Sequence, residues 1–61
     1  MYQITYLAAD GTLYYLRGTV WTSIVERADT YSDKAAADAA FAKAAKFTAP
    51  IVRKTAKIIA C

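Results

Sequence analysis

The side chains that could carry out catalysis in this chain are few and scattered. Its 61 residues include five carboxylates, one cysteine and no histidine. Nucleophilic catalysis needs a base beside a serine, cysteine or threonine, and that base is usually a histidine; here the one cysteine is the last residue, Cys61. Gly11 and Gly18 are the only glycines, too few for a phosphate-binding loop. We therefore expect a protein that is not an enzyme and that has no cofactor and no metal site.

The five carboxylates have simpler structural interpretations than acid–base chemistry. Asp10 falls in a predicted turn and Glu26 in a predicted helix cap. Asp29, Asp33 and Asp38 surround the start of a predicted helix. Although Asp29 and Asp33 are four residues apart, Asp29 should precede the helix, so we do not expect the pair on one helix face.

The basic side chains suggest binding rather than catalysis. Residues 1–38 hold three basic groups and five acids, a balance of −2, whereas residues 39–61 hold five basic groups and no acid, a balance of +5. Such a segment can contact the phosphates of a nucleic acid without reading its sequence. A solvated basic face that keeps the protein soluble explains it equally well. The candidate basic patch consists of Lys43, Lys46, Arg53, Lys54 and Lys57.

The N-terminal residues predict a β-hairpin. Residues 2–8 and 12–17 are rich in tyrosine, threonine and aliphatic side chains, which favour strands. A two-residue turn would place Tyr6 opposite Tyr15. A three-residue loop with Gly11 in the left-handed conformation would place Tyr6 opposite Tyr14 and Ile4 opposite Leu16. We favour the second register.

The chosen register sorts the hairpin into two faces. The face that we expect in the core carries Tyr2, Ile4, Tyr6, Tyr14 and Leu16. The opposite face carries Gln3, Thr5, Leu7, Leu13, Tyr15 and Arg17. Tyrosine and arginine often dominate protein interfaces, and an exposed tyrosine can also stack on nucleic acid bases. The candidate partner-binding residues are therefore Gln3, Thr5, Tyr15 and Arg17, with an ordinary solvated sheet surface as the plain alternative.

The segment from Thr19 to Tyr31 is less regular. Residues 19–22 suit a short extended piece, and Trp21 is more typical of a core residue than of an interface anchor. Residues 23–26 have the spacing of a capping box, which predicts one helical turn with Ile24 and Val25 in the core. Residues 28–31 are expected to be extended again and to supply a third strand.

An alanine-rich helix is the clearest element. We predict that Ser32 caps it and that it runs from Asp33 to about Lys46. Phe41 and Phe47 lie with small residues on one stripe at helical spacing, and we expect this stripe to cover the sheet. The small members of the stripe are Ala37, Ala40 and Ala44.

Residues 49–61 fit two structures. As a helix, they would gather Ile51, Val52, Thr55, Ile58 and Ile59 on one face, with Pro50 tolerated in the first turn. As a strand, the β-branched residues would complete a sheet beneath the helix. We favour a strand over about residues 55–60.

These elements define one α+β domain spanning residues 1–61. We expect a small antiparallel sheet, made of the N-terminal hairpin and a C-terminal strand, covered by one alanine-rich helix in the order β-β-(β)-α-β. The alternative is a hairpin followed by two helices. With no secretion signal and no long apolar run, we expect a cytoplasmic protein that does not enter a membrane. Cys61 is interpreted as part of a frayed end rather than a reactive thiol.

One stretch resembles a loose class of small phage and prophage proteins. The resemblance covers roughly residues 13–45 and rests on short features in a fixed order. These are Tyr15-Leu16-Arg17-Gly18, Trp21-Thr22, Ala28 three residues before Tyr31, and Ser32 leading into the alanine-spaced helix.

The resemblance suggests a function but identifies no functional residues, because the members of the class have no site in common. Many members of that class have no known activity, and some bind and inhibit a host enzyme or a host defence complex. This chain departs from them in being basic, which argues against mimicry of DNA. The sequence thus predicts a phage-type accessory protein that binds, and inhibits, a host protein complex such as a defence or transcription complex. The alternative is a nucleic-acid-binding module using the basic end, and a second copy of the chain is a further candidate partner.

Overall fold

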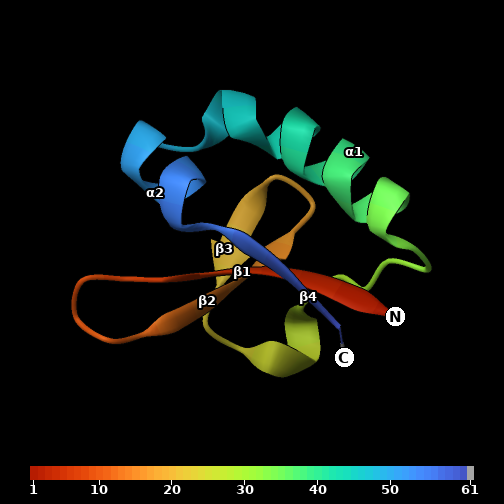
Figure 1. Ribbon diagram of the computed structural model, residues 1–61. Coiled ribbons are helices and arrows are strands. Elements are labelled where there is room, and N and C mark those ends of the chain that lie inside the picture. The colour runs from red at the N-terminus through yellow and green to blue at the C-terminus, as the bar shows by residue number, and fades with distance from the viewer. Residues whose placement is uncertain (61) are drawn as a thin grey trace.

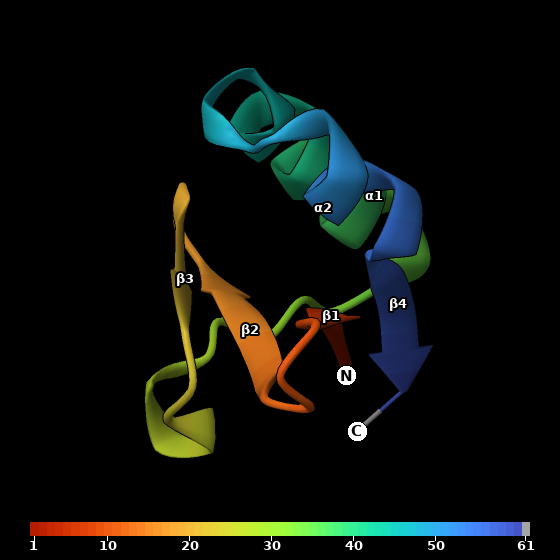
Figure 2. The same ribbon diagram turned by 90° about the vertical axis from the view of Figure 1, so that its left-hand side faces the viewer.

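The computed structural model describes residues 1–60 and has the α+β architecture that the sequence predicts. A four-stranded antiparallel sheet has the order β3-β2-β1-β4. The main helices lie together on one side of this sheet (Figures 1 and 2). The strands are β1 (Tyr2–Leu7), β2 (Leu13–Arg17), β3 (Val20–Thr22) and β4 (Lys57–Ala60). The helices are α1 (Lys34–Ala44) and α2 (Pro50–Thr55), with the 3-10 turns η1 (Val25–Arg27) and η2 (Ala45–Phe47).

The hairpin has the predicted register. Tyr6 pairs with Tyr14, and Thr5 pairs with Tyr15. The N–H of Gly11 donates to the carbonyl of Ala8 at 3.0 Å, and Gly11 has a φ of 88°. A glycine tolerates this left-handed conformation because it has no Cβ, so the three-residue loop forms and sets which residues face the core.

The third strand comes from a different segment than residues 28–31. A tight turn at Gly18, whose φ is 61°, folds Val20–Thr22 straight back onto β2. The edge of β2 is therefore occupied before residues 28–31 are reached. Those residues instead close the end of the sheet: Tyr31 makes an isolated bridge with Tyr2, and the N–H of Asp29 donates to the carbonyl of Leu16 at 3.1 Å.

The core lies between the sheet and α1 and is small. Ile4, Leu16, Ala37 and Ala44 are fully buried or nearly so. Because Ala37 and Ala44 are short, α1 can lie close to the sheet. Six partly buried side chains pack around this centre, as the sequence led us to expect for most of them: Tyr2, Trp21, Tyr31, Ala40, Phe41 and Ile58.

The cap of α1 is one residue later than predicted. Asp33, not Ser32, is the N-cap, and its Oδ1 accepts a hydrogen bond from the N–H of Ala36 at 2.7 Å. A carboxylate at this position also interacts favourably with the helix dipole. This gives Asp33 the capping role and leaves Ser32 exposed.

The cap yields a stability prediction with a matched control. Asp33→Ala should lower the free energy of unfolding by about 1 kcal/mol, the usual effect of losing an N-cap, whereas Ser32→Ala should change it by less than about 0.5 kcal/mol. Urea unfolding followed by circular dichroism measures both. If Ser32→Ala lowers the free energy of unfolding more than Asp33→Ala does, Ser32 is the N-cap.

The end of α1 corrects the expected position of Phe47. The α-helix stops at Ala44 and tightens into η2, so the stripe does not continue and Phe47 is 72% exposed. Pro50 contributes to this ending because it holds the preceding residue, Ala49, in an extended conformation with ψ of 146°. Phe41 lies in the interior of α1 and packs on the core as predicted.

The C-terminal segment is a short helix and then a strand. Pro50 occupies the first turn of α2, where its missing N–H costs nothing. β4 then pairs with β1 over residues 57–60, so the favoured C-terminal strand is confirmed with a start two residues later than expected.

The segment after β3 forms the predicted single turn but not the predicted cap or core contact. The turn is η1, and it begins one residue later than the capping box indicated. The hydroxyl of Thr22 accepts from the N–H of Ile24 at 3.1 Å, and Ser23 makes no cap bond to η1. Ile24 and Val25 are each 46% exposed and do not plug the core, because η1 lies on the side of the sheet opposite the helices (Figure 1).

Candidate binding surfaces

The side of the sheet that faces away from α1 and α2 is the first candidate surface. Residues paired across antiparallel strands point to the same side, and one row of pairs runs Thr22, Tyr15, Thr5 and Lys57 from β3 to β4. We call this side the outer face. Its other members are Gln3, Leu7, Leu13, Arg17, Val20 and Ile59.

The four predicted partner-binding residues all lie on the outer face, but two are inaccessible. Gln3 is 9% exposed and Thr5 is 5% exposed, so neither side chain forms the open polar patch that we expected. Both lie on β1, which has a neighbouring strand on each side, β2 and β4. Tyr15 is half-buried and Arg17 is exposed. The available part of the predicted patch is therefore Tyr15 and Arg17.

The outer face is also more apolar than predicted. Leu7 and Val20 are about equally exposed, at 60% and 61%, and Leu13 and Ile59 are partly exposed. Ile24 and Val25, each 46% exposed, lie at the start of η1, and η1 is on the same side of the sheet (Figure 1). The hairpin register placed Leu7 and Leu13 here, whereas Val20 and Ile59 could be assigned only once the pairings of β3 and β4 were known.

The aromatic side chains of the opposite, helix-facing side pack on one another. The rings of Tyr6 and Tyr14 stack with centroids 5.2 Å apart, and Tyr6 meets Trp21 edge-to-face at 4.7 Å. The indole N–H of Trp21 donates to the hydroxyl of Thr48 at 3.3 Å. Burial, with the nearby Tyr14, raises the pKa of Tyr6 above its usual value. Trp21 is thus a packing residue, as its interpretation from sequence favoured.

The basic residues divide between two sides of the molecule. Lys43, Lys46, Arg53 and Lys54 are exposed on α1, η2 and α2, whereas Lys57 belongs to the outer face. Arg53 has a structural contact, since its guanidinium donates to the carbonyl of Ala45 at 3.2 Å. Phe47 in η2 and Ile51 in α2 are each 72% exposed.

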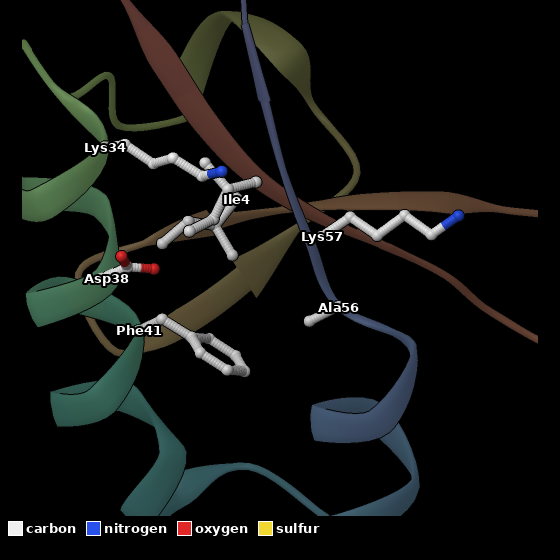
Figure 3. A pocket seen from close by; sticks show the side chains of 7 residues that line it. Ile4, Lys34, Asp38, Phe41, Ala56 and Lys57 are labelled. Atoms are coloured by element: carbon white, nitrogen blue, oxygen red, sulfur yellow. The ribbon is translucent and has the colours of Figure 1, made fainter.

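A hollow of about 460 Å³ opens between α1 and β4 (Figure 3). Asp38 and Phe41 project into it from α1, and Ala56 faces them from the end of α2, just before β4. Lys34 reaches across toward Ile4, which forms part of the floor, while the side chain of Lys57 extends away from the hollow. The lining is thus mainly apolar with one carboxylate and one ammonium group, a composition that suits an apolar side chain with polar neighbours.

Three of the five carboxylates hold backbone amides. Oδ1 of Asp10 accepts from Thr12 at 2.9 Å, and this bond holds the pKa of Asp10 below its ordinary value. Oδ2 of Asp29 accepts from Gly18 at 2.7 Å, and Asp33 caps α1. These are the turn and cap roles that the sequence indicated for Asp10 and for the helix start.

Residues 1–60 contain neither a candidate metal centre nor a candidate membrane span. No group of three or more potential metal-ligating side chains comes together in that range. None of the helices there has the length and apolar character to cross a membrane. The prediction that Cys61 is part of a frayed end falls outside the described residues.

The fold and these surfaces define a small α+β protein with exposed apolar side chains on both sides of the sheet and a hollow between α1 and β4. Comparisons with protein-family models, with curated proteins and with solved structures found no match to this chain.

Proposed function

We propose that the protein is a non-catalytic binding protein that docks on a partner protein through its outer face. The supporting observation is that each strand contributes one exposed large apolar side chain to this face: Leu7, Leu13, Val20 and Ile59. Contiguous exposed apolar patches on small proteins usually mark interaction sites. Tyr15 and Arg17 supply the side-chain types that most often dominate binding energy.

The resemblance to small phage and prophage proteins narrows the proposed partner. It favours a host protein complex, such as a defence or transcription complex, that the protein inhibits by occupying a surface. This proposal places the protein in the cytoplasm, where such complexes act. An inhibitor that acts by covering a partner's surface needs no metal or cofactor of its own, because it catalyses no reaction.

The proposal predicts that Tyr15 and Arg17 contribute to binding and not to folding. The double variant Tyr15→Ala/Arg17→Ala should bind the stoichiometric partner at least about tenfold more weakly, since central interface residues of these types each contribute about 2 kcal/mol or more. Its melting temperature should stay within a few degrees of wild type, because Arg17 is exposed and Tyr15 is only half-buried. Calorimetric titration and thermal unfolding measure the two effects.

The matched control changes the other surface. Lys43→Gln/Lys46→Gln/Lys54→Gln removes three charges from the helical side while leaving Arg53 and its bond to Ala45 intact. This variant should keep full affinity for the protein partner. Equal losses in both variants, or a loss only in the lysine variant, would count against the outer face as the docking surface.

A nucleic-acid-binding module is the second candidate function. The observation that favours it is that Lys43, Lys46, Arg53 and Lys54 are all exposed on α1, η2 and α2, the segments that also carry the exposed ring of Phe47. If this candidate is correct, log affinity for nucleic acid should fall with log salt concentration by roughly 0.9 for each phosphate neutralised. The triple lysine variant would then reduce that slope, and undetectable binding at low salt would remove the candidate.

A further inference from the structure

The free edge of β4 is a place where another strand can be added to the sheet. β4 is the last strand in the sheet order β3-β2-β1-β4, so one of its sides has no neighbouring strand among the described residues. An exposed edge carries backbone N–H and C=O groups that can pair with another extended chain. The edge is short, at four residues, and carries one lysine, which are features that limit uncontrolled pairing.

The hydrogen bonds of β1 show which groups of β4 point outward. Tyr2 exchanges backbone bonds with Tyr31, and Ala8 bonds to Thr12, so the even residues of β1 direct their backbone groups away from β4. The odd residues Gln3 and Thr5 therefore bond to their β4 partners, Ile59 and Lys57. It follows that the N–H and C=O of Ile58 and Ala60 point to the free edge.

The hollow between α1 and β4 lies beside this edge. Ile58 of β4 and Ala56, just before β4, line it on one side, and Phe41 and Asp38 line it from α1 (Figure 3). Residues added opposite Ile58 would share its side of the sheet and so place their side chains toward the hollow. The next residues along would face the outer side, next to the exposed ammonium group of Lys57.

We propose that the edge of β4 and the hollow beside it bind an extended peptide segment of a partner protein, added antiparallel as a fifth strand. The segment alternates apolar residues, which enter the hollow, with acidic residues, which face Lys57. Main-chain hydrogen bonds give affinity in this mode, and pockets for alternate side chains give specificity. Lys57 belongs to both this site and the outer face, but β1 separates the edge of β4 from Tyr15 and Arg17 on β2, so strand addition does not depend on binding at those two residues.

Charge selects this occupant over a second copy of the chain. Lys34 and Lys57 flank the edge against the single carboxylate of Asp38, and the whole chain carries a net charge of +3. Two copies would bring two positive molecules together, with Lys57 near each edge. An acidic segment meets complementary charge instead.

The direct test is titration of the full chain with synthetic nine-residue peptides, followed by fluorescence anisotropy. The peptide of alternating valine and glutamate should bind at least about tenfold more tightly than one of alternating valine and lysine. Methylating the backbone nitrogens of the valines should abolish binding, because in an antiparallel addition these amides bond to Ile58 and Ala60. Methylating the glutamate nitrogens should have little effect. If neither methylation changes the affinity of the peptide, the proposed strand addition is wrong.

Two protein variants test the hollow and the charge. Ala56→Leu fills the hollow and should weaken binding at least about tenfold, whereas Ala39→Leu, on an exposed part of α1, should not. Lys57→Glu should reverse the preference, so that the valine–lysine peptide becomes the tighter ligand. An unchanged preference in that variant would contradict the assigned role of Lys57.

The remaining outcomes separate this site from its alternatives. Tyr15→Ala/Arg17→Ala should bind the valine–glutamate peptide as wild type does, so loss of peptide binding there would overturn the separation of the two surfaces. A concentration-dependent dimer that disappears in Ile58 N-methyl protein, made by chemical synthesis, would assign the edge to a second copy instead. If no peptide binds but the outer face still binds a partner, the edge proposal alone fails.

Discussion

Leu16→Ala is expected to unfold most of the protein. The Leu16 side chain is completely buried, and Ile4 is the only other large side chain among residues 1–60 that is fully buried. Truncating a buried leucine costs about 2–5 kcal/mol, because both apolar contacts and packing are lost. A domain of this size has a free energy of unfolding of only about 5 kcal/mol. Thermal and urea unfolding by circular dichroism should therefore show a large unfolded population at room temperature.

Leu13→Ala is the control for this result. Leu13 is a leucine on the same strand, β2, but it lies on the outer face and is 40% exposed. Its truncation should cost no more than about 1 kcal/mol, since a surface side chain loses little contact. If the Leu13 variant unfolds and the Leu16 variant does not, the faces of β2 are reversed and the outer face proposed for binding is wrong.

Phe41→Ala is expected to have the second largest effect, a loss of about 3 kcal/mol in the free energy of unfolding. Phe41 packs on the core from the middle of α1, but one side of its ring borders the hollow. The loss should therefore fall at the lower end of the range for buried phenylalanines. A cooperative transition at a much lower urea midpoint would confirm it.

The matched control is Phe47→Ala. Phe47 is the other phenylalanine of the same helical segment and is 72% exposed. Its truncation should change the free energy of unfolding by no more than about 0.5 kcal/mol. Equal losses at the two positions would mean that the helical stripe continues to Phe47, as its spacing in the sequence indicated.

The parts of the fold that were predicted correctly depend on local rules. Asp10 and Gly11 define the hairpin loop, because the carboxylate accepts from Thr12 and the glycine adopts the left-handed conformation. That loop fixed the register, and the register separated Ile4 and Leu16 from Tyr15 and Arg17. The alanine-rich composition then identified the one long helix.

The errors arose where a tertiary contact competes with a local pattern. The spacing of Phe41 and Phe47 suits a continuous helix, but Thr48 bonds to the carbonyl of Ala44 and to Trp21, and Pro50 then ends the turn. Residues 28–31 have strand-like composition, but β3 had already paired with β2. The pattern of residues within one segment cannot show whether the strand it would pair with already has a neighbour at that edge.

The candidate site was predicted in part for the same reason. Tyr15 and Arg17 follow from alternation along β2 alone, and the structure places them on the outer face. Gln3 and Thr5 are buried because β4 pairs on the far side of β1, a neighbour that the hairpin sequence does not reveal. The hollow beside β4 could not be predicted, since it depends on how far α1 lies from that strand.

The proposed use of the outer face is tested most directly by site-specific photo-crosslinking to the partner. A photoreactive phenylalanine analogue is placed either at Leu13, on the outer face, or at Phe47, on the helical side; both side chains are exposed. We predict a one-to-one crosslinked product from the Leu13 position, lost when Tyr15 and Arg17 are also replaced by alanine, and no product from Phe47. A product from Phe47 alone would place the partner on the helical side and contradict the proposal.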